Sequence, residues 1–316
     1  MKNAIRGMLV SLTSIAALTF GSAALAQDAA RVTFPGPNGV TLSGVRYTPA
    51  GFAQASNLSA VVMMHGCSGM WSNRDPSADN TDGTPNLQNN VEKWGLELAA
   101  QGVVALAVDS FTTRTPAGVS DNDWQNQCSG ATYASAVDSY TTRADDARAG
   151  YDWLAGDTAH IDGASIALLG WSHGAQASLV QAAATPRTSN TARASADMVF
   201  AATVVFYPGC GSALGFNSPS SSYFRPYADL RLNIGDADSF YANCQTRADR
   251  AVNNYGSTAG SGHEVVFAGY SGAAHSFDNF SQTWPTTVCT GSSTTGDECA
   301  MRDADIESLE FLLGRI

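Results

Sequence analysis

Short apolar runs separated by polar and glycine-rich segments recur along the chain beyond residue 60. The apolar residues in these runs are consecutive rather than alternating, which is typical of strands buried on both faces of a parallel sheet. Most runs end at Gly, Asp or Pro, where a buried strand gives way to a turn. We expect strands at 61–64, 103–108, 166–169, 199–206, 230–234 and 265–267.

Between these runs the apolar residues recur at helical spacing. The segment 87–101 stops at Gly102, and 136–154 carries its charged residues away from its apolar ones. Further helices are predicted at 173–184 and 305–313. Strands that alternate with helices and no dividing linker predict one α/β domain, with a mostly parallel central sheet and helices on both faces.

The first 26 residues have the pattern of a secretory signal. A basic start precedes an apolar stretch at 8–20, and Ala24-Leu25-Ala26 supplies a small-residue cleavage site. The alternative is an uncleaved anchor helix, but several Ser and Thr residues make the stretch short and polar for crossing a bilayer. We therefore expect residues 1–26 to be removed and 27–316 to reach the periplasm or medium without a membrane anchor.

Composition narrows the classes of partner. The 316 residues carry a formal net charge of −11, and 44% are hydrophobic. Apolar content of this size excludes intrinsic disorder. The acidity argues against nucleic acid or an anionic membrane as a partner, because both require clustered Lys and Arg.

The expected export would place the six cysteines in an oxidising compartment. An even number of cysteines there is typical of disulfides. No C-x-x-C pair is present, so no structural zinc or other metal site is expected. Six cysteines permit 15 connectivities, and a free buried Cys67 thiol is the alternative for one of them. Chain position favours the pairs Cys210–Cys244, Cys289–Cys299 and, by what remains, Cys67–Cys128.

A nucleophile motif lies where one predicted strand ends. Residues 170–174 read Gly-Trp-Ser-His-Gly, between the strand at 166–169 and the helix that begins at His173. G-x-S-x-G in this context places the serine on a sharp strand-to-helix turn, with its hydroxyl exposed and the helix N-terminus directed at a forming oxyanion. Ser172 is therefore the predicted nucleophile.

A serine hydroxyl needs a base, and His275 is the best placed of the five histidines. It lies in a small-residue loop just after the strand 265–267, at the end of the sheet where ligands bind. His65 is expected to order a turn, and His160 and His263 precede strands at the opposite end.

The acid of a Ser–acid–His order should follow the strand 230–234. Asp236 and Asp238 both lie there, and Asp238 is favoured because it sits deeper in the loop, while Asp236 can cap a following helix. The backbone N–H of His173 and one from the turn at 65–69, with Cys67 favoured, are expected to form an oxyanion hole.

Several segments together resemble the dienelactone hydrolase family of α/β-hydrolases. The resemblance implies the α/β-hydrolase fold and places the family's acid on Asp238 and its histidine on His275. The enzyme that names the family uses a cysteine nucleophile where this chain has Ser172, which favours a general carboxylesterase. The matching segments are HGCSG 65–69, VDSFTTR 108–114, GWSHG 170–174, FYPGC 206–210, IGDADSF 234–240 and GAAHSFDN 272–279.

Three further residues are candidates for binding substrate. Arg114 can hold a carboxylate with its guanidinium, although pairing with Asp109 or another acid is the alternative. Trp71 and Trp171 flank the predicted oxyanion turn and nucleophile and can line an acyl pocket, with core packing as their alternative role.

The sequence thus predicts an exported serine hydrolase of carboxylic esters, acting on a small or polymeric ester without cofactor or metal. A secreted peptidase of the same fold, or a catalytically silent binding protein that keeps the fold, is the alternative.

Overall fold

A computed structural model describes residues 28–128, 136–184, 194–210, 224–252, 263–287, 289 and 296–316. The predicted signal, residues 1–26, lies outside these ranges. Within them, no helix is both long enough and apolar enough to cross a bilayer.

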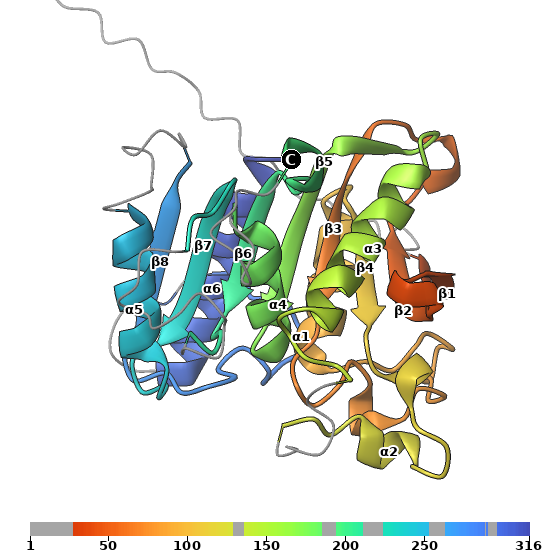
Figure 1. The fold of residues 1–316 in the computed structure, drawn as a ribbon, viewed down its shortest axis with the longest axis horizontal. Coiled ribbons are helices and arrows are strands. Elements are labelled where there is room, and N and C mark those ends of the chain that lie inside the picture. Colours follow the sequence, from red (N-terminus) through yellow and green to blue (C-terminus); the bar gives the residue numbers. More distant parts are fainter. Residues whose placement is uncertain are drawn as a thin grey trace, which may run out of the picture.

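The described strands form one twisted sheet in the order β1-β2-β4-β3-β5-β6-β7-β8 (Figure 1). All neighbours from β4 to β8 pair in parallel, whereas β2 runs antiparallel to both β1 and β4. The mostly parallel sheet predicted from the sequence is confirmed. The strands are β1 Asp28–Pro35, β2 Thr41–Thr48, β3 Leu58–Met64, β4 Val104–Asp109, β5 Ile161–Trp171, β6 Ala202–Phe206, β7 Asp229–Gly235 and β8 Val265–Tyr270.

The hairpin β1–β2 was not predicted. Its strands pair antiparallel at one edge of the sheet, and most residues of β1 are exposed or half-buried. A strand with only one buried face alternates apolar and polar residues instead of forming a continuous apolar run. The pattern that identified the six parallel strands therefore passes over β1, and in β2 the apolar residues are interrupted by Ser43, Gly44 and Arg46.

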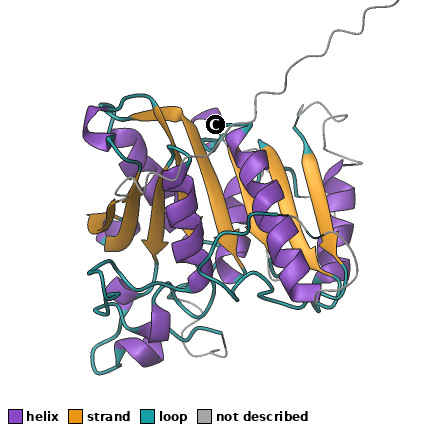
Figure 2. Ribbon diagram, turned by 180° about the vertical axis from the view of Figure 1, so that it is seen from behind, coloured by secondary structure: helices purple, strands orange, loops and turns teal. Residues whose placement is uncertain are grey.

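Helices cover both faces of the sheet: α3, α4 and α5 lie on one face, and α1 and α6 on the other (Figures 1 and 2). The bounds are α1 Asn89–Ala100, α2 Asp121–Trp124, α3 Thr142–Gly156, α4 His173–Ala182, α5 Tyr241–Arg250 and α6 Gly296–Leu313.

Two helices begin elsewhere than predicted. Helix α3 begins at Thr142 rather than 136, because the Asp138 carboxylate accepts the backbone N–H groups of Tyr140 and Thr141 and forms a turn there. Helix α6 begins at Gly296 rather than 305, with Asp297 and Glu298 in its first turn, where acids stabilise a helix.

Alternate residues of β3 face the two layers of helices. Val61 and Met63 belong to the larger apolar cluster, which also includes residues of α1, α4 and α6, and Val62 and Met64 pack with residues of α3. All four side chains are fully buried. A strand in this position needs apolar residues throughout, which explains the run seen in the sequence.

The three predicted disulfides are confirmed. The first joins the turn after β3 to the end of the loop after β4, where the Gln127 N–H also donates to the Cys67 carbonyl over 2.9 Å. The loops 65–88 and 110–128, with α2, form a lobe beyond the carboxyl ends of β3 and β4 (Figure 1). The bridges are Cys67–Cys128, Cys210–Cys244 and Cys289–Cys299.

Candidate active site

Ser172 occupies a strained turn between β5 and α4. Its φ of 50° and ψ of −111° lie outside the regions that L-residues ordinarily adopt. A Cβ added to Gly170 would lie 2.4 Å from Ser178 Oγ, and one added to Gly174 would lie 2.1 Å from the Met64 carbonyl oxygen. The two glycines of the motif are therefore required by the packing of this turn.

The structure brings Ser172, His275 and Asp238 into one hydrogen-bonded chain. The distance from Ser172 Oγ to His275 Nε2 is 2.9 Å, and that from His275 Nδ1 to Asp238 Oδ2 is 2.6 Å. The three residues follow β5, β8 and β7, so they meet at the carboxyl edge of the sheet. The Asp238 side chain is only 1% exposed, whereas 39% of the His275 side chain is open to solvent.

The two aspartates after β7 have separate positions. Asp238 bonds His275 with one oxygen and accepts the Phe240 N–H with the other, over 2.8 Å. Asp236 instead accepts the Gly272 N–H over 2.7 Å, which fixes the start of the loop that carries His275. Asp236 does not cap the helix that follows: the N-cap residue of α5 is Phe240, and no side chain caps it.

A buried tyrosine, Tyr207, packs against the ring of His275 and was not predicted as a site residue from the sequence. The Tyr207 ring lies 4.8 Å from the His275 ring, centroid to centroid. Asp278, fully buried, accepts hydrogen bonds from the Tyr207 hydroxyl and from Trp171 Nε1. Burial raises the pKa of Asp278. In the sequence, only the FYPGC and HSFDN segments, which contain Tyr207 and Asp278, indicated that these residues belong near the site.

The turn at 65–69 lies directly against the nucleophile. A Cβ on Gly66 would be 3.7 Å from Ser172 Cβ. Within the described ranges, the backbone N–H groups of Cys67 and His173 donate to no acceptor. Two unpaired N–H groups beside a serine hydroxyl are the arrangement that an oxyanion hole requires.

Arg143 of α3 joins this turn to the turn that carries Ser172. Its guanidinium donates to the His65 carbonyl oxygen over 2.6 Å and lies 2.8 Å from His173 Nδ1. The side chain is fully buried over the Phe111 ring, and burial lowers the pKa of Arg143 to about 9. The sequence pattern had placed this charge outside the apolar face of its helix.

The two histidines next to Arg143 are neutral. Burial, followed by the charge of Arg143, lowers the pKa of His173 to about 3 and that of His65 well below its ordinary value. Arg143 has only donors to offer, so Nδ1 of His173 accepts its hydrogen bond. His65 lies 2.7 Å from the Gly66 carbonyl oxygen through Nδ1, in the turn-ordering role expected of it.

The three residues considered for substrate binding have structural contacts. Arg114 pairs with the buried Asp146 through both terminal nitrogens, at 2.9 and 2.6 Å, and not with Asp109. Trp71 is 2% exposed and donates to Asp109 over 2.7 Å, and Trp171 is fully buried. The structure thus shows ion pairing for Arg114 and core packing for Trp71 and Trp171.

The remaining histidines are remote from Ser172. His160 Nδ1 lies 2.7 Å from Asp157 Oδ1, and His263 lies 3.8 Å from Asp229, both beside the starts of strands. The part of the chain that the structure describes contains no cluster of three or more His, Cys, Asp or Glu able to hold a metal ion.

No protein-family model matches this sequence, and no curated protein matches it either. Solved structures do match. Esterase 2 of Thermogutta terrifontis is 17% identical, with 90% of this chain and 94% of that chain covered and a TM-score of 0.56. A putative dienelactone hydrolase from Klebsiella pneumoniae is 13% identical over 91% of this chain and 99% of that one, with a TM-score of 0.59. The chain has the α/β-hydrolase fold.

Another match with this fold differs in extent. A putative dipeptidyl aminopeptidase IV from Bacteroides ovatus is 13% identical, with a TM-score of 0.57, and covers 92% of this chain. Only 36% of the aminopeptidase chain is covered. The esterase and the dienelactone hydrolase are therefore covered almost end to end by the present chain, and the aminopeptidase is covered over only about a third of its length.

Proposed function

We propose that this protein is an exported serine hydrolase of carboxylic esters. The observation that carries the proposal is the hydrogen-bonded chain from Ser172 through His275 to Asp238 on a strained turn, with two unpaired N–H groups beside it. Each part of this arrangement corresponds to one step of acyl transfer through a covalent intermediate.

In the proposed reaction, His275 takes the proton of Ser172 as the hydroxyl oxygen attacks the ester carbonyl. Asp238 holds the Nδ1–H of the imidazole and stabilises the cation that forms. The N–H groups of Cys67 and His173 bind the oxyanion of the tetrahedral intermediate. His275 then protonates the leaving alcohol, and in the second half it activates a water molecule that releases the acid.

Arg143 takes part in this mechanism as a positioning residue. It ties the carbonyl of His65, two residues before Cys67, to the ring of His173, and both of these loops supply a proposed oxyanion donor. A donor aimed correctly before the reaction costs no reorganisation when charge develops. The buried cation also lies near the developing negative charge, which it favours.

The solved structures support an ester as the substrate. Esterase 2 of Thermogutta terrifontis has been solved phosphorylated by paraoxon and with propionate bound. The present chain covers nearly the full length of this esterase and of the Klebsiella protein. It covers only 36% of the aminopeptidase chain. We therefore prefer an esterase to a peptidase of the same fold. Three disulfides support the proposed export, since such bonds persist in oxidising compartments.

The test is turnover of a short p-nitrophenyl ester by the purified protein and by Ser172→Ala. We expect wild-type turnover, and a loss of kcat in the variant of at least about 10³-fold, because the residual rate comes from the oxyanion hole alone. Equal thermal unfolding of the two proteins controls for folding. Equal turnover by both would overturn the serine mechanism.

A second arm distinguishes the substrate class. Paraoxon should label the wild type once, on the peptide that contains Ser172, as judged by mass spectrometry of the digested protein. A panel of esters and of peptide p-nitroanilides then compares kcat/KM. If Ser172 is labelled and the anilides are turned over faster than the esters, Ser172 remains the nucleophile and the protein is a peptidase rather than an esterase. If Ser172 is not labelled and no substrate is turned over, the proposed hydrolase is refuted and a catalytically silent binding protein is the remaining alternative.

A further inference from the structure

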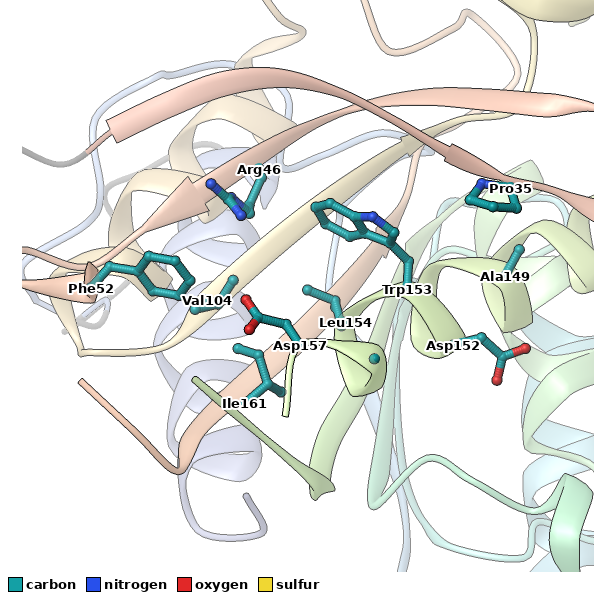
Figure 3. A pocket seen from close by; sticks show the side chains of 11 residues that line it. Pro35, Arg46, Phe52, Val104, Ala149, Asp152, Trp153, Leu154, Asp157 and Ile161 are labelled. Carbon is teal, nitrogen blue, oxygen red and sulfur yellow. The ribbon is translucent and has the colours of Figure 1, made fainter. Parts of the chain in front are cut away.

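A cavity of about 550 Å³ opens at the edge of the sheet opposite to Ser172 (Figure 3). Val104 and Ile161, the first residues of β4 and β5, line it, whereas Ser172 follows the last residue of β5. The cavity lies between the hairpin β1–β2 and α3. Its volume is within the range of small-molecule sites, roughly 300 to 1,000 Å³.

Most of the lining is apolar. Val104, Leu154 and Ile161 are nearly or fully buried and supply an aliphatic surface. Phe52 and Trp153 are half-buried and contribute their rings. Such a lining favours the apolar body of a ligand, at about 25 cal/mol for each Å² removed from water.

Arg46 of β2 provides a cation in this apolar setting. Its Cζ lies 5.1 Å from the Phe52 ring centroid and 5.8 Å from that of Trp153. The Nε atom is buried without a hydrogen-bond partner, and among the described residues the guanidinium forms no ion pair. A buried donor left unpaired destabilises the folded state, more so when it is charged, and an anion in the cavity would remove that cost.

The two acids of the lining already have partners. Asp152 pairs with Arg148 Nε over 2.8 Å, and Asp157 Oδ1 lies 2.7 Å from His160 Nδ1. Neither carboxylate comes within ion-pair distance of Arg46. Figure 3 shows Arg46 and Trp153 along one side of the cavity, with Asp157 and Ile161 across from them.

We propose that this cavity binds a small carboxylate with an apolar body, of the size of a medium-chain fatty acid. The guanidinium of Arg46 takes the carboxylate, because its planar fork matches two carboxylate oxygens. The rings of Phe52 and Trp153 hold the fork in place, and the chain of the ligand covers Leu154 and Ile161. The site is separate from Ser172 and does not depend on the proposed esterase activity.

The experiment measures octanoate binding by isothermal titration calorimetry in the Ser172→Ala background, where no ester chemistry interferes. We expect one site per chain, and at least tenfold weaker binding in Arg46→Met, which keeps the length of the side chain and removes its charge. Arg302→Met is the matched control: this partly exposed arginine of α6 pairs with Glu298, and neither residue lines the cavity. Its octanoate affinity should equal that of the parent.

Two further measurements can overturn the proposal. Octanamide, which keeps the chain and lacks the charge, should bind at least tenfold more weakly than octanoate, and equal binding would exclude recognition by Arg46. In wild-type protein, octanoate inhibition that competes with the ester and is unchanged in Arg46→Met would place the ligand at Ser172. Absence of binding would equally refute the site. Trp153→Leu should weaken octanoate several-fold and leave ester turnover unchanged.

Discussion

The two sides of Ser172 are held in different ways. On the side of β3 and β4, the turn with Cys67 is fixed by a disulfide and by the fully buried Arg143. On the side of β7 and β8, the loop with His275 is fixed by hydrogen bonds from its backbone to Asp236 and Asp297. The turn with Cys67 thus has a covalent support, whereas the described supports of the base are hydrogen bonds and the packing of Tyr207.

This difference corresponds to what each side has to do. An oxyanion donor works by being in position before charge develops, so rigidity is to its advantage. A base must accept a proton, release it to the leaving alcohol and then act on water, so its ring has to remain accessible. The 39% exposure of the His275 side chain agrees with that requirement.

The largest effect is expected on the side of the base. Asp238→Asn should lower kcat by about 10³–10⁴-fold, because an amide nitrogen facing Nδ1 disfavours the productive tautomer of His275. Asp236→Asn should stay within about tenfold, since the asparagine oxygen can still accept the Gly272 N–H. Steady-state kinetics on one ester decides between them. A worse result for Asp236→Asn would reverse the assignment of the acid.

On the side of the oxyanion turn, the next effect is on stability. Replacing Cys67 and Cys128 together by serine should lower the free energy of unfolding by roughly 4 kcal/mol, from the entropy of a loop of 61 residues. The matched change at Cys289 and Cys299, which close a loop of 10, should cost about 3 kcal/mol.

Denaturant titrations of both double variants measure these losses, and kcat of the folded variants gives the second readout. We expect kcat to fall in the first variant and to stay near wild type in the second. Equal kcat in both would mean that the bridge stabilises the lobe without positioning the turn.

A smaller effect on rate is expected from Arg143→Met, with kcat lowered by about 10–10²-fold and KM little changed. It acts through the loops that carry the donors, so its loss should cost less than removal of a donor itself, about 10²–10³-fold. Affinity for a boronic acid that adds to Ser172 should fall by the same factor as kcat.

Arg247→Met is the control for the burial of a guanidinium. Arg247 is also buried, and burial lowers its pKa to about 10, but it donates to Cys210 on another part of the edge. This variant should lose thermal stability and keep its ratio of boronic acid affinity to kcat. The same kinetic loss in both variants would reduce Arg143 to a structural residue.

A further effect concerns acid stability. His65 and His173 stay neutral in the folded protein at pH values where an unfolded histidine, with a pKa of about 6.5, takes up a proton. The unfolded state then binds more protons, so the free energy of unfolding falls as pH decreases below about 6.5, by up to 1.4 kcal/mol per pH unit for each histidine.

Denaturant midpoints between pH 7 and 5 measure this slope. His173→Asn should flatten it by the share of one histidine, while His160→Asn, on the opposite edge of the sheet, serves as the comparison. An unchanged slope in His173→Asn would show that this histidine is charged in the folded protein.

The inner sheet and the site residues could be predicted because both follow from local rules. Continuous apolar runs identify β3 to β8, and the ends of parallel strands are where Ser172, Asp238 and His275 lie. The hairpin was missed because the half-exposed β1 lacks such a run and polar or glycine residues interrupt the run in β2. The pairing of Cys210 with Cys244 followed from two successive strands, that of Cys289 with Cys299 from the loop between them, and that of Cys67 with Cys128 from what remained.

Arg143 shows what local rules leave out. Its charge predicts an exposed position on α3, yet the side chain is buried and contacts both the turn at His65 and the turn at His173. Only the folded chain brings these two turns together. The partners of Arg114 and Trp71, which are Asp146 and Asp109, are likewise distant in sequence, so the sequence alone did not identify Asp146 or the Trp71–Asp109 hydrogen bond. Position along the chain indicates which loop a residue belongs to, not which direction its side chain takes.

The disulfide between Cys67 and Cys128 makes the structure beside Ser172 depend on the redox state of the compartment. In a reducing cytosol the turn beside Ser172 would keep its hydrogen bonds to Arg143 and Gln127 and lose its covalent tie to the loop after β4. Under the proposed function, a newly made chain would therefore be less active towards the esters of its own cell. With the proposed export, oxidation outside the cytoplasm would complete the site.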